Sequence, residues 1–232
     1  MAETKKVVLL IVEGPTDADA LNPILKKLFE DSTVRFHIVH GDITIKDDIN
    51  SRNAVTKVNG CIKQEMQRYR YKAADLLRVI HIIDTDGAFS PEECVVYESI
   101  DHVAYTDALI KTSNVEGIIR RNKTKREVVR RLASTGKIQS IPYELYYMSR
   151  NLEHVLHGIS EVLTDEEKRD YADEFADKYE NDLDGFKQFI CSSDFAVKGS
   201  FNETWEYIFQ GSNSLKRHSN MHLMLKENPR EM

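Results

Sequence analysis

Apolar residues in the first third of the chain alternate between continuous runs and helically spaced stripes. The apolar run at residues 5–12 predicts a strand covered on both faces, as in a parallel sheet, and residues 34–39 and 76–83 predict a second and a third strand. The stripes between them predict one helix capped at Thr16 and a second helix ending near Tyr69. Strand, helix, strand, helix and strand in this order predict right-handed crossovers and an α/β fold, with a mainly parallel sheet flanked by helices.

From residue 86 onward the pattern is weaker. It predicts short strands near residues 94–97 and 103–105 and a helix that begins at about Asn122. A further strand is expected at residues 143–148, with a helix directly after it.

The last third of the chain is predicted to be helical. Thr164 and Glu167 form a capping-box pattern, and the aromatic and apolar residues after them repeat on one helical face. We therefore divide the chain into an α/β core, residues 1–158, and a helical C-terminal extension, residues 159–232.

The 232-residue chain has a net charge of −6, which at first disfavours nucleic acid as a partner. The acidity is local, however. Residues 161–184 contain eleven acidic and three basic residues, so this segment carries −8 and the remainder of the chain carries +2. Nucleic acid therefore stays an admissible partner.

The longest apolar stretch, residues 7–12, is far shorter than the roughly 20 residues that cross a bilayer. Residues 1–6 contain no apolar segment followed by a cleavage site, so no secretory signal is expected. The cysteines are isolated from one another, which argues against a zinc site and a disulfide framework. We expect a cytoplasmic protein that does not bind membranes.

Acidic side chains directly follow the first and third predicted strands. Glu13 and Asp17 come after the first strand, and Asp84 and Asp86 come after the third. In a doubly wound sheet both loops lie at the carboxyl ends of strands, where ligands bind, so the four carboxylates are expected to converge. Carboxylates that close together repel one another unless a cation neutralises them, and oxygen ligands suit Mg²⁺, with Mn²⁺ as an alternative. The sequence thus predicts a magnesium site, although each acid taken singly is also typical of a helix cap.

These two segments together resemble a known domain. An apolar strand ending in Glu13-Gly14 with Asp17 shortly after it, then a strand ending in Asp84-x-Asp86, is similar to the toprim domain of topoisomerases, bacterial primases, RNA-maturing ribonucleases and OLD (overcoming lysogenisation defect) nucleases. The resemblance implies a toprim-like, Rossmann-like core in which Glu13 acts as a general acid or base and the two aspartates of the second strand hold metal. Asp17 matches the second acid of the OLD and ribonuclease motif.

A later segment narrows the resemblance to the OLD enzymes. Arg150-Asn-Leu-Glu-His is similar to the Arg-x-Ile-Glu-Asn-Tyr motif that follows their metal motifs, with His154 standing where that family has asparagine. The likeness implies that Glu153 completes a second metal site. A structural ion pair between Arg150 and Glu153 at the helix start is the alternative. OLD enzymes also use a later lysine, for which Lys198 and Lys216 are both candidates.

OLD proteins join their toprim domain to an ATPase domain, but no Gly-x-x-x-x-Gly-Lys-Ser/Thr loop occurs in this sequence. The resemblance therefore implies a separate ATPase partner for any regulation by ATP. By the same analogy we expect a role in anti-phage defence, as the nuclease half of a two-protein system. Assembly into a homo-oligomer is left open.

Seven basic residues crowd into one short segment, at a density that suits contacts with several phosphates of a nucleic-acid backbone. They are Arg120, Arg121, Lys123, Lys125, Arg126, Arg130 and Arg131. Arg150 is expected to contact nucleic acid as well. Apolar residues in the same segment give the predicted helix a docking side, so a solvated helix face is the alternative interpretation.

These features predict a metal-dependent nuclease, a hydrolase that cleaves phosphodiester bonds with one or two Mg²⁺ ions and with DNA as the favoured substrate. Two alternatives stay open. A ribonuclease that matures structured RNA would carry the same toprim motif. A non-catalytic toprim module that regulates an ATPase partner would bind metal or nucleic acid without turnover.

Overall fold

The first strand of the chain is an interior strand of the sheet and is buried on both faces. β1 (Val7–Val12) is buried along its whole length and pairs in parallel with β2 (Thr33–Ile38) on one side and β3 (Leu76–Asp84) on the other. β8 (Ile141–Met148) pairs in parallel with β3, and β7 (Lys137–Ile138) is an antiparallel edge strand. The order β2-β1-β3-β8-β7 makes the sheet mainly parallel, so the predicted α/β class is confirmed.

The structure is a computed structural model that describes residues 6–30, 32–39, 42–46, 48–226 and 230. In these ranges no helix combines the length and the apolar character needed to span a membrane.

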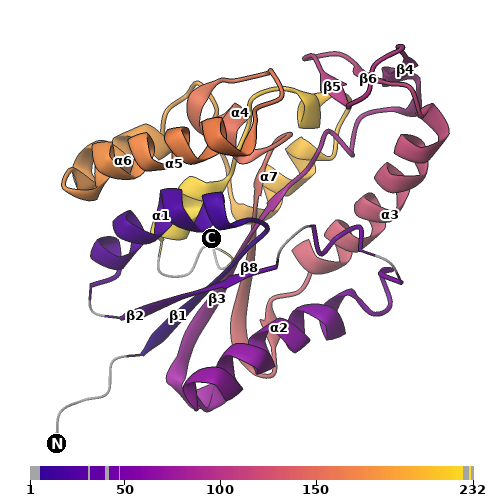
Figure 1. The fold of residues 1–232 in the computed structure, drawn as a ribbon. Helices are drawn as coiled ribbons and strands as arrows, with labels where there is room; N and C mark the ends of the chain where they lie inside the picture. Colours follow the sequence, from indigo (N-terminus) through magenta and orange to yellow (C-terminus); the bar gives the residue numbers. More distant parts are fainter. Residues whose placement is uncertain (1–5, 31, 40–41, 47, 227–229, 231–232) are drawn as a thin grey trace, which may run out of the picture.

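Helices cover both faces of the sheet (Figure 1). α1 (Pro15–Leu28), α5 (Asp165–Glu180) and α6 (Leu183–Ile190) pack together on one face. α2 (Ala54–Tyr69) and α3 (Val115–Ala133) pack together on the other. Because α1 and α2 lie on opposite faces, the winding of the chain reverses between β1 and β3. Ligands bind α/β sheets at such switch points, outside the carboxyl ends of the strands.

The residues that lie between β3 and α3 in the sequence form a second, smaller sheet. It has the order β4-β6-β5, formed by β4 (Val95–Tyr97), β5 (Ala104–Tyr105) and β6 (Ile110–Thr112). Leu215 joins its hydrophobic cluster from far along the sequence. The strands expected near residues 94–97 and 103–105 are therefore present, and β6 is an addition.

The C-terminal segment is largely helical, but it packs into the same hydrophobic core as the sheet. The remaining helices are α4 (Leu152–His157), α7 (Phe201–Ile208) and four short 3-10 helices, η1 (Ala73–Asp75), η2 (Glu92–Cys94), η3 (Asn213–Leu215) and η4 (Met221–Leu225). The backbone N–H of Ser149 donates to the carbonyl of His218 at 2.9 Å, and Ser219 forms a β-bridge with Met148. Residues on both sides of the predicted boundary at residue 158 therefore belong to one hydrophobic core.

The predicted starts of two helices are wrong. α1 begins one residue before Thr16, because Gly14 is its N-cap and a proline fits the first helical position. α3 begins at Val115 and not near Asn122, because the side chain of Asn114 caps it by accepting a hydrogen bond from Gly117 N at 3.0 Å. Asn122 is instead buried within the helix.

We expect Gly87→Ala to lower the free energy of unfolding by about 2 kcal/mol. Gly87 has a φ of +63°, and a Cβ there would lie 2.4 Å from Leu215 Cδ2, so alanine combines backbone strain with a clash against a buried side chain. Urea unfolding followed by circular dichroism measures the effect. Gly60→Ala is the control, since an added Cβ meets nothing within 4 Å and alanine favours the helix by up to about 1 kcal/mol. Equal effects of the two substitutions would contradict the prediction.

Candidate functional site

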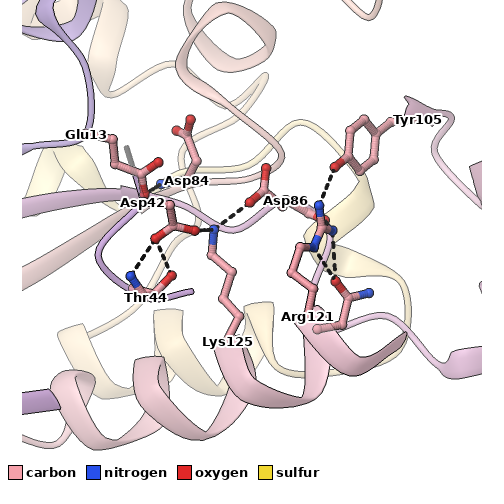
Figure 2. Close-up of polar contacts among 9 residues, drawn as sticks. Glu13, Asp42, Thr44, Asp84, Asp86, Tyr105, Arg121 and Lys125 are labelled. Carbon is pink, nitrogen blue, oxygen red and sulfur yellow. Dashed lines mark hydrogen bonds and ion pairs between the residues drawn. The ribbon is translucent and has the colours of Figure 1, made fainter. Parts of the chain in front are cut away.

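The ends of β1 and β3 are joined by an acidic side chain. Glu13 follows β1 directly, and its Oε1 accepts a hydrogen bond from the backbone N–H of Asp84 at 3.2 Å. The carboxylates of Glu13 and Asp84 lie side by side above the strand ends (Figure 2). The chain thus places acids from two different strand ends in one neighbourhood.

Asp84 is the acid on which most of the other carboxylates of the site act. Burial raises its pKa well above the usual range, and repulsion from four other carboxylates, those of Glu13, Asp17, Asp86 and Glu153, raises it further. The structure therefore brings all five acids that the sequence singles out within electrostatic range of one position.

Glu13 has the same kind of environment. Burial raises its pKa well above the usual range; Lys125 opposes this shift, and Asp42 and Asp86 add to it. A carboxylate in this position is a stronger base than an exposed glutamate.

Asp17 has two roles at the start of α1. Its Oδ2 accepts a hydrogen bond from the backbone N–H of Gly14 at 2.9 Å, so it caps the helix. Burial nevertheless raises its pKa to about 6, against the effect of that hydrogen bond, and Glu153 adds repulsion. The capping alternative is therefore correct for Asp17, and the side chain still belongs to the acidic neighbourhood.

A lysine ammonium lies between two carboxylates of the site (Figure 2). The side chain of Lys125, from α3, has no exposed surface, and its Nζ donates to Asp86 Oδ2 at 2.6 Å and to Asp42 Oδ2 at 2.5 Å. The other oxygen of Asp42 accepts hydrogen bonds from the backbone N–H and hydroxyl of Thr44 at 2.6 and 2.5 Å. Because Asp42 follows β2, a third strand end contributes to the site.

The charges of Asp86 and Lys125 stabilise each other. Burial alone raises the pKa of Asp86, but attraction to Lys125 and Arg121 outweighs burial, and the pKa falls below its usual value. Burial likewise lowers the pKa of Lys125, but Asp86, Asp42 and Glu13 outweigh it and hold the pKa well above its usual value. Both groups are therefore charged at neutral pH.

Backbone hydrogen bonds fix the loop that carries Asp86. Asp86 has a left-handed φ of 49°, as does Arg150 on the neighbouring strand end with a φ of 56°, and Asp86 N donates to Arg150 O at 3.0 Å. Arg121 donates from Nη2 to the carbonyl of Asp86 at 3.0 Å and from Nη1 to the hydroxyl of Tyr105 at 3.2 Å. Arg121 therefore connects the small sheet, through Tyr105, with the loop that carries Asp86.

Glu153 and Arg150 do not pair with each other. Glu153 is buried in the first turn of α4, and Lys168 Nζ, from α5, lies 3.7 Å from its Oε1. The guanidinium of Arg150 donates to the carbonyl of Leu215 and to Asp107, both at 2.5 Å. The helix-start ion pair considered from the sequence is therefore wrong, and Arg150 is a buried cross-link of the loops and not a surface cation.

The two lysines proposed from the resemblance, Lys198 and Lys216, are both exposed. In the part of the chain that the structure describes, the lysines that pair with carboxylates of the site are Lys125 and Lys168.

The basic segment divides into two sets. Four of its side chains form an exposed stripe at helical spacing on α3, which we call the α3 stripe; they are Arg120, Lys123, Arg130 and Arg131. Lys125 points into the carboxylates, Arg121 bonds the Asp86 loop, and Arg126 is partly buried and donates to the carbonyl of Asn122. Of the seven residues of the basic segment, the four of the α3 stripe are therefore the exposed ones, and the exposed acid Glu127 lies among them.

The sequence interpretation missed two residues of the site, Asp42 and Lys168. It gave a third, Lys125, the wrong role, since this predicted nucleic-acid contact is buried and paired with two carboxylates. Asp42 had the same signal as Glu13, an acid just after a predicted parallel strand. The inward direction of Lys125 could be read from its helical spacing with the apolar residues Ile118 and Val129, which α3 buries. Lys168 has no such signal, since its contact depends on how α5 packs.

No three His, Cys, Asp or Glu side chains of the described residues are placed together as ligands of a metal ion. Comparison of the chain with protein-family models, with curated proteins and with solved structures finds no match in any of the three.

The raised pKa of Asp17 predicts a pH-dependent loss of stability. A carboxyl whose pKa is higher in the folded state, here about 6, favours folding when protonated, so this contribution is present at about pH 4 and is lost as pH rises through 6. Asp17→Asn keeps an oxygen for Gly14 N but does not titrate. Its stability relative to the wild type should rise with pH, by up to about 3 kcal/mol at neutral pH in the absence of divalent ions. Urea unfolding over this pH range measures it, and a pH-independent difference would contradict it.

The α3 stripe predicts a salt-dependent affinity for nucleic acid. Removing two of its charges, in the double variant Arg120→Ala and Lys123→Ala, should reduce the slope of log K against log salt by about 2 for duplex DNA. The matched control is Lys26→Ala with Lys27→Ala, because α1 lies on the opposite face of the sheet. Fluorescence anisotropy at several salt concentrations measures both, and equal slopes for the two double variants would exclude the stripe as the binding surface.

Proposed function

We propose that this chain is a divalent-metal-dependent nuclease of the toprim type, closest in pattern to the OLD enzymes, which hydrolyses phosphodiester bonds of DNA. One observation carries the proposal. Glu13 is hydrogen-bonded to the backbone of Asp84, and four carboxylates from three segments of the chain lie within electrostatic range of Asp84 at the switch point of a parallel sheet, where α/β proteins bind their ligands. Structural acids do not ordinarily gather in this way, because their repulsion costs stability unless a cation offsets it.

The donor set suits Mg²⁺, or Mn²⁺ in its place. All five groups are carboxylates, and hard cations prefer oxygen ligands. Proteins usually hold Mg²⁺ through one or two carboxylates and several waters, so a group of three side chains is not required. Glu13 and Asp84 are the residues that would hold the ion, with Asp17 and Glu153 adding negative charge beside them. When bound, the ion would supply positive charge to the phosphate in the transition state.

Glu13 is the residue proposed to move the proton. The oxygen of a water molecule forms a new bond to phosphorus as the bond from phosphorus to the leaving sugar oxygen breaks. Glu13 accepts the proton that the water loses, and the leaving oxygen is protonated by solvent. The hydrogen bond from the backbone N–H of Asp84 fixes the position of the Glu13 carboxylate, which suits a group that must meet the attacking water.

Activity against plasmid DNA in Mg²⁺ tests the proposal. We expect Glu13→Gln and Asp84→Asn each to lower the cleavage rate at least about a hundredfold, since each removes a charge from the centre of the site while keeping its shape. Asp19→Asn is the matched control, because it removes an exposed carboxylate on α1 and should leave the rate unchanged. Cleavage that persists in both site variants would assign the activity elsewhere.

Two rival functions are distinguished by the same assay. Preferred cleavage of structured RNA over DNA would favour the maturing ribonuclease. Binding of nucleic acid with no turnover in Mg²⁺ or Mn²⁺, alone and with a candidate ATPase, would favour the non-catalytic regulatory module. The ion pairs that Lys125 makes inside the acidic site are the observation in favour of this second rival, since they already neutralise part of it.

A further inference from the structure

Lys125 occupies a position inside the carboxylate cluster that an ion could otherwise fill. Its Nζ lies within 2.6 Å of one oxygen of Asp86 and within 2.5 Å of one oxygen of Asp42, and the side chain is fully buried. Burying an ammonium costs several kcal/mol unless close anions compensate it. Two carboxylates provide that compensation here, so the lysine is held as a fixed cation (Figure 2).

Both carboxylates that hold Lys125 are themselves held. Thr44 bonds the second oxygen of Asp42 through its N–H and its hydroxyl. Asp86 is fixed through its backbone, whose N–H donates to Arg150 and whose carbonyl accepts from Arg121. A metal ion entering between the two carboxylates would have to displace an ammonium from a rigid, matched pair of acceptors.

The site therefore has two halves with different charge balance. In one half, Asp42 and Asp86 share the positive charge of Lys125. In the other half, Glu13 bonds the backbone N–H of Asp84, and these two carboxylates repel each other. Asp86 is attracted by Arg121 as well as by Lys125, whereas among the described residues no side-chain ion pair is formed by Glu13 or Asp84.

We propose that the Lys125 ammonium takes the place of a second metal ion, so that the site binds one divalent ion, on the side of Glu13 and Asp84. Asp86 then pairs with the ammonium and does not coordinate the metal. This inference rests on the proposed function and differs from the expectation of two metals that the resemblance raises through Glu153. Two-metal nucleases hold two cations in one carboxylate site. A fixed ammonium in contact with Asp42 and Asp86 supplies positive charge there without exchanging with solvent.

Metal stoichiometry tests the inference independently of cleavage. Isothermal titration of the purified chain with Mn²⁺ should give one bound ion for the wild type. Lys125→Met removes the ammonium but keeps a similar shape, and it leaves Asp42 and Asp86 free to bind, so it should give two bound ions. Lys123→Met, exposed on the same helix, is the control and should give one. Two ions on the wild type, or one ion on a folded Lys125→Met variant, would overturn the inference.

A second variant keeps the test decisive if Lys125→Met does not fold. The triple variant Asp42→Asn, Asp86→Asn and Lys125→Met has no net charge in the Lys125 half, so it avoids uncompensated carboxylates. We expect it to fold, as judged by circular dichroism, and to bind one Mn²⁺ ion. Loss of that ion would show that Asp86 is a metal ligand and would overturn the inference.

Failure of the proposed function gives a different result. One ion on the wild type and two on Lys125→Met, without cleavage of any nucleic acid, would support the role of Lys125 and refute the nuclease. Cleavage with two ions on the wild type would support the nuclease and refute the role of Lys125.

Discussion

The repulsion among carboxylates at the ends of parallel strands is the constraint that organises this molecule. In a parallel sheet the carboxyl ends of neighbouring strands lie on the same side. The fold itself therefore brings together Glu13, Asp42 and Asp84, which lie at or after the carboxyl ends of β1, β2 and β3. Lys125 offsets part of that charge from α3, and Lys168 approaches Glu153 from α5. Helices from opposite faces of the sheet therefore both deliver cations to the same edge, and the charge balance of the site depends on how they pack.

Much of the fold follows from the sequence because a strand buried on both faces leaves a continuous apolar run. β1 is such a run, and β3 and β8 are largely apolar apart from Arg78, His81 and Glu144, so these three strands of the parallel sheet could be predicted. β7 gave no signal, because its hairpin turns at Gln139 and Ser140, which adopt φ values of 51° and 66° without the glycine that such turns favour. The start of α3 was predicted too late because the cap at Asn114, whose side chain accepts a hydrogen bond from Gly117 N, was not recognised.

The site was predictable to the extent that it depends on strand ends. Glu13 and Asp84 come together because β1 and β3 are neighbours, which local patterns indicate. The direction of each basic side chain on α3 was not predictable from charge alone. Lys125 and Lys123 are two residues apart and look equivalent in a charge count, yet one is buried among acids and the other is exposed. The partner of Glu153 depends on the packing of α5, a tertiary contact that no local pattern encodes.

The loops of the site are closed by residues from much later in the chain. The carbonyl of Leu215 accepts the guanidinium of Arg150, 65 positions earlier, and the Leu215 side chain fills the space left by the missing Cβ of Gly87. During synthesis on a ribosome the sheet strands emerge first, and the loop that carries Asp86 lacks this support until residue 215 has left the exit tunnel. The acidic edge therefore completes its loops only after the residues around Leu215 can fold against them.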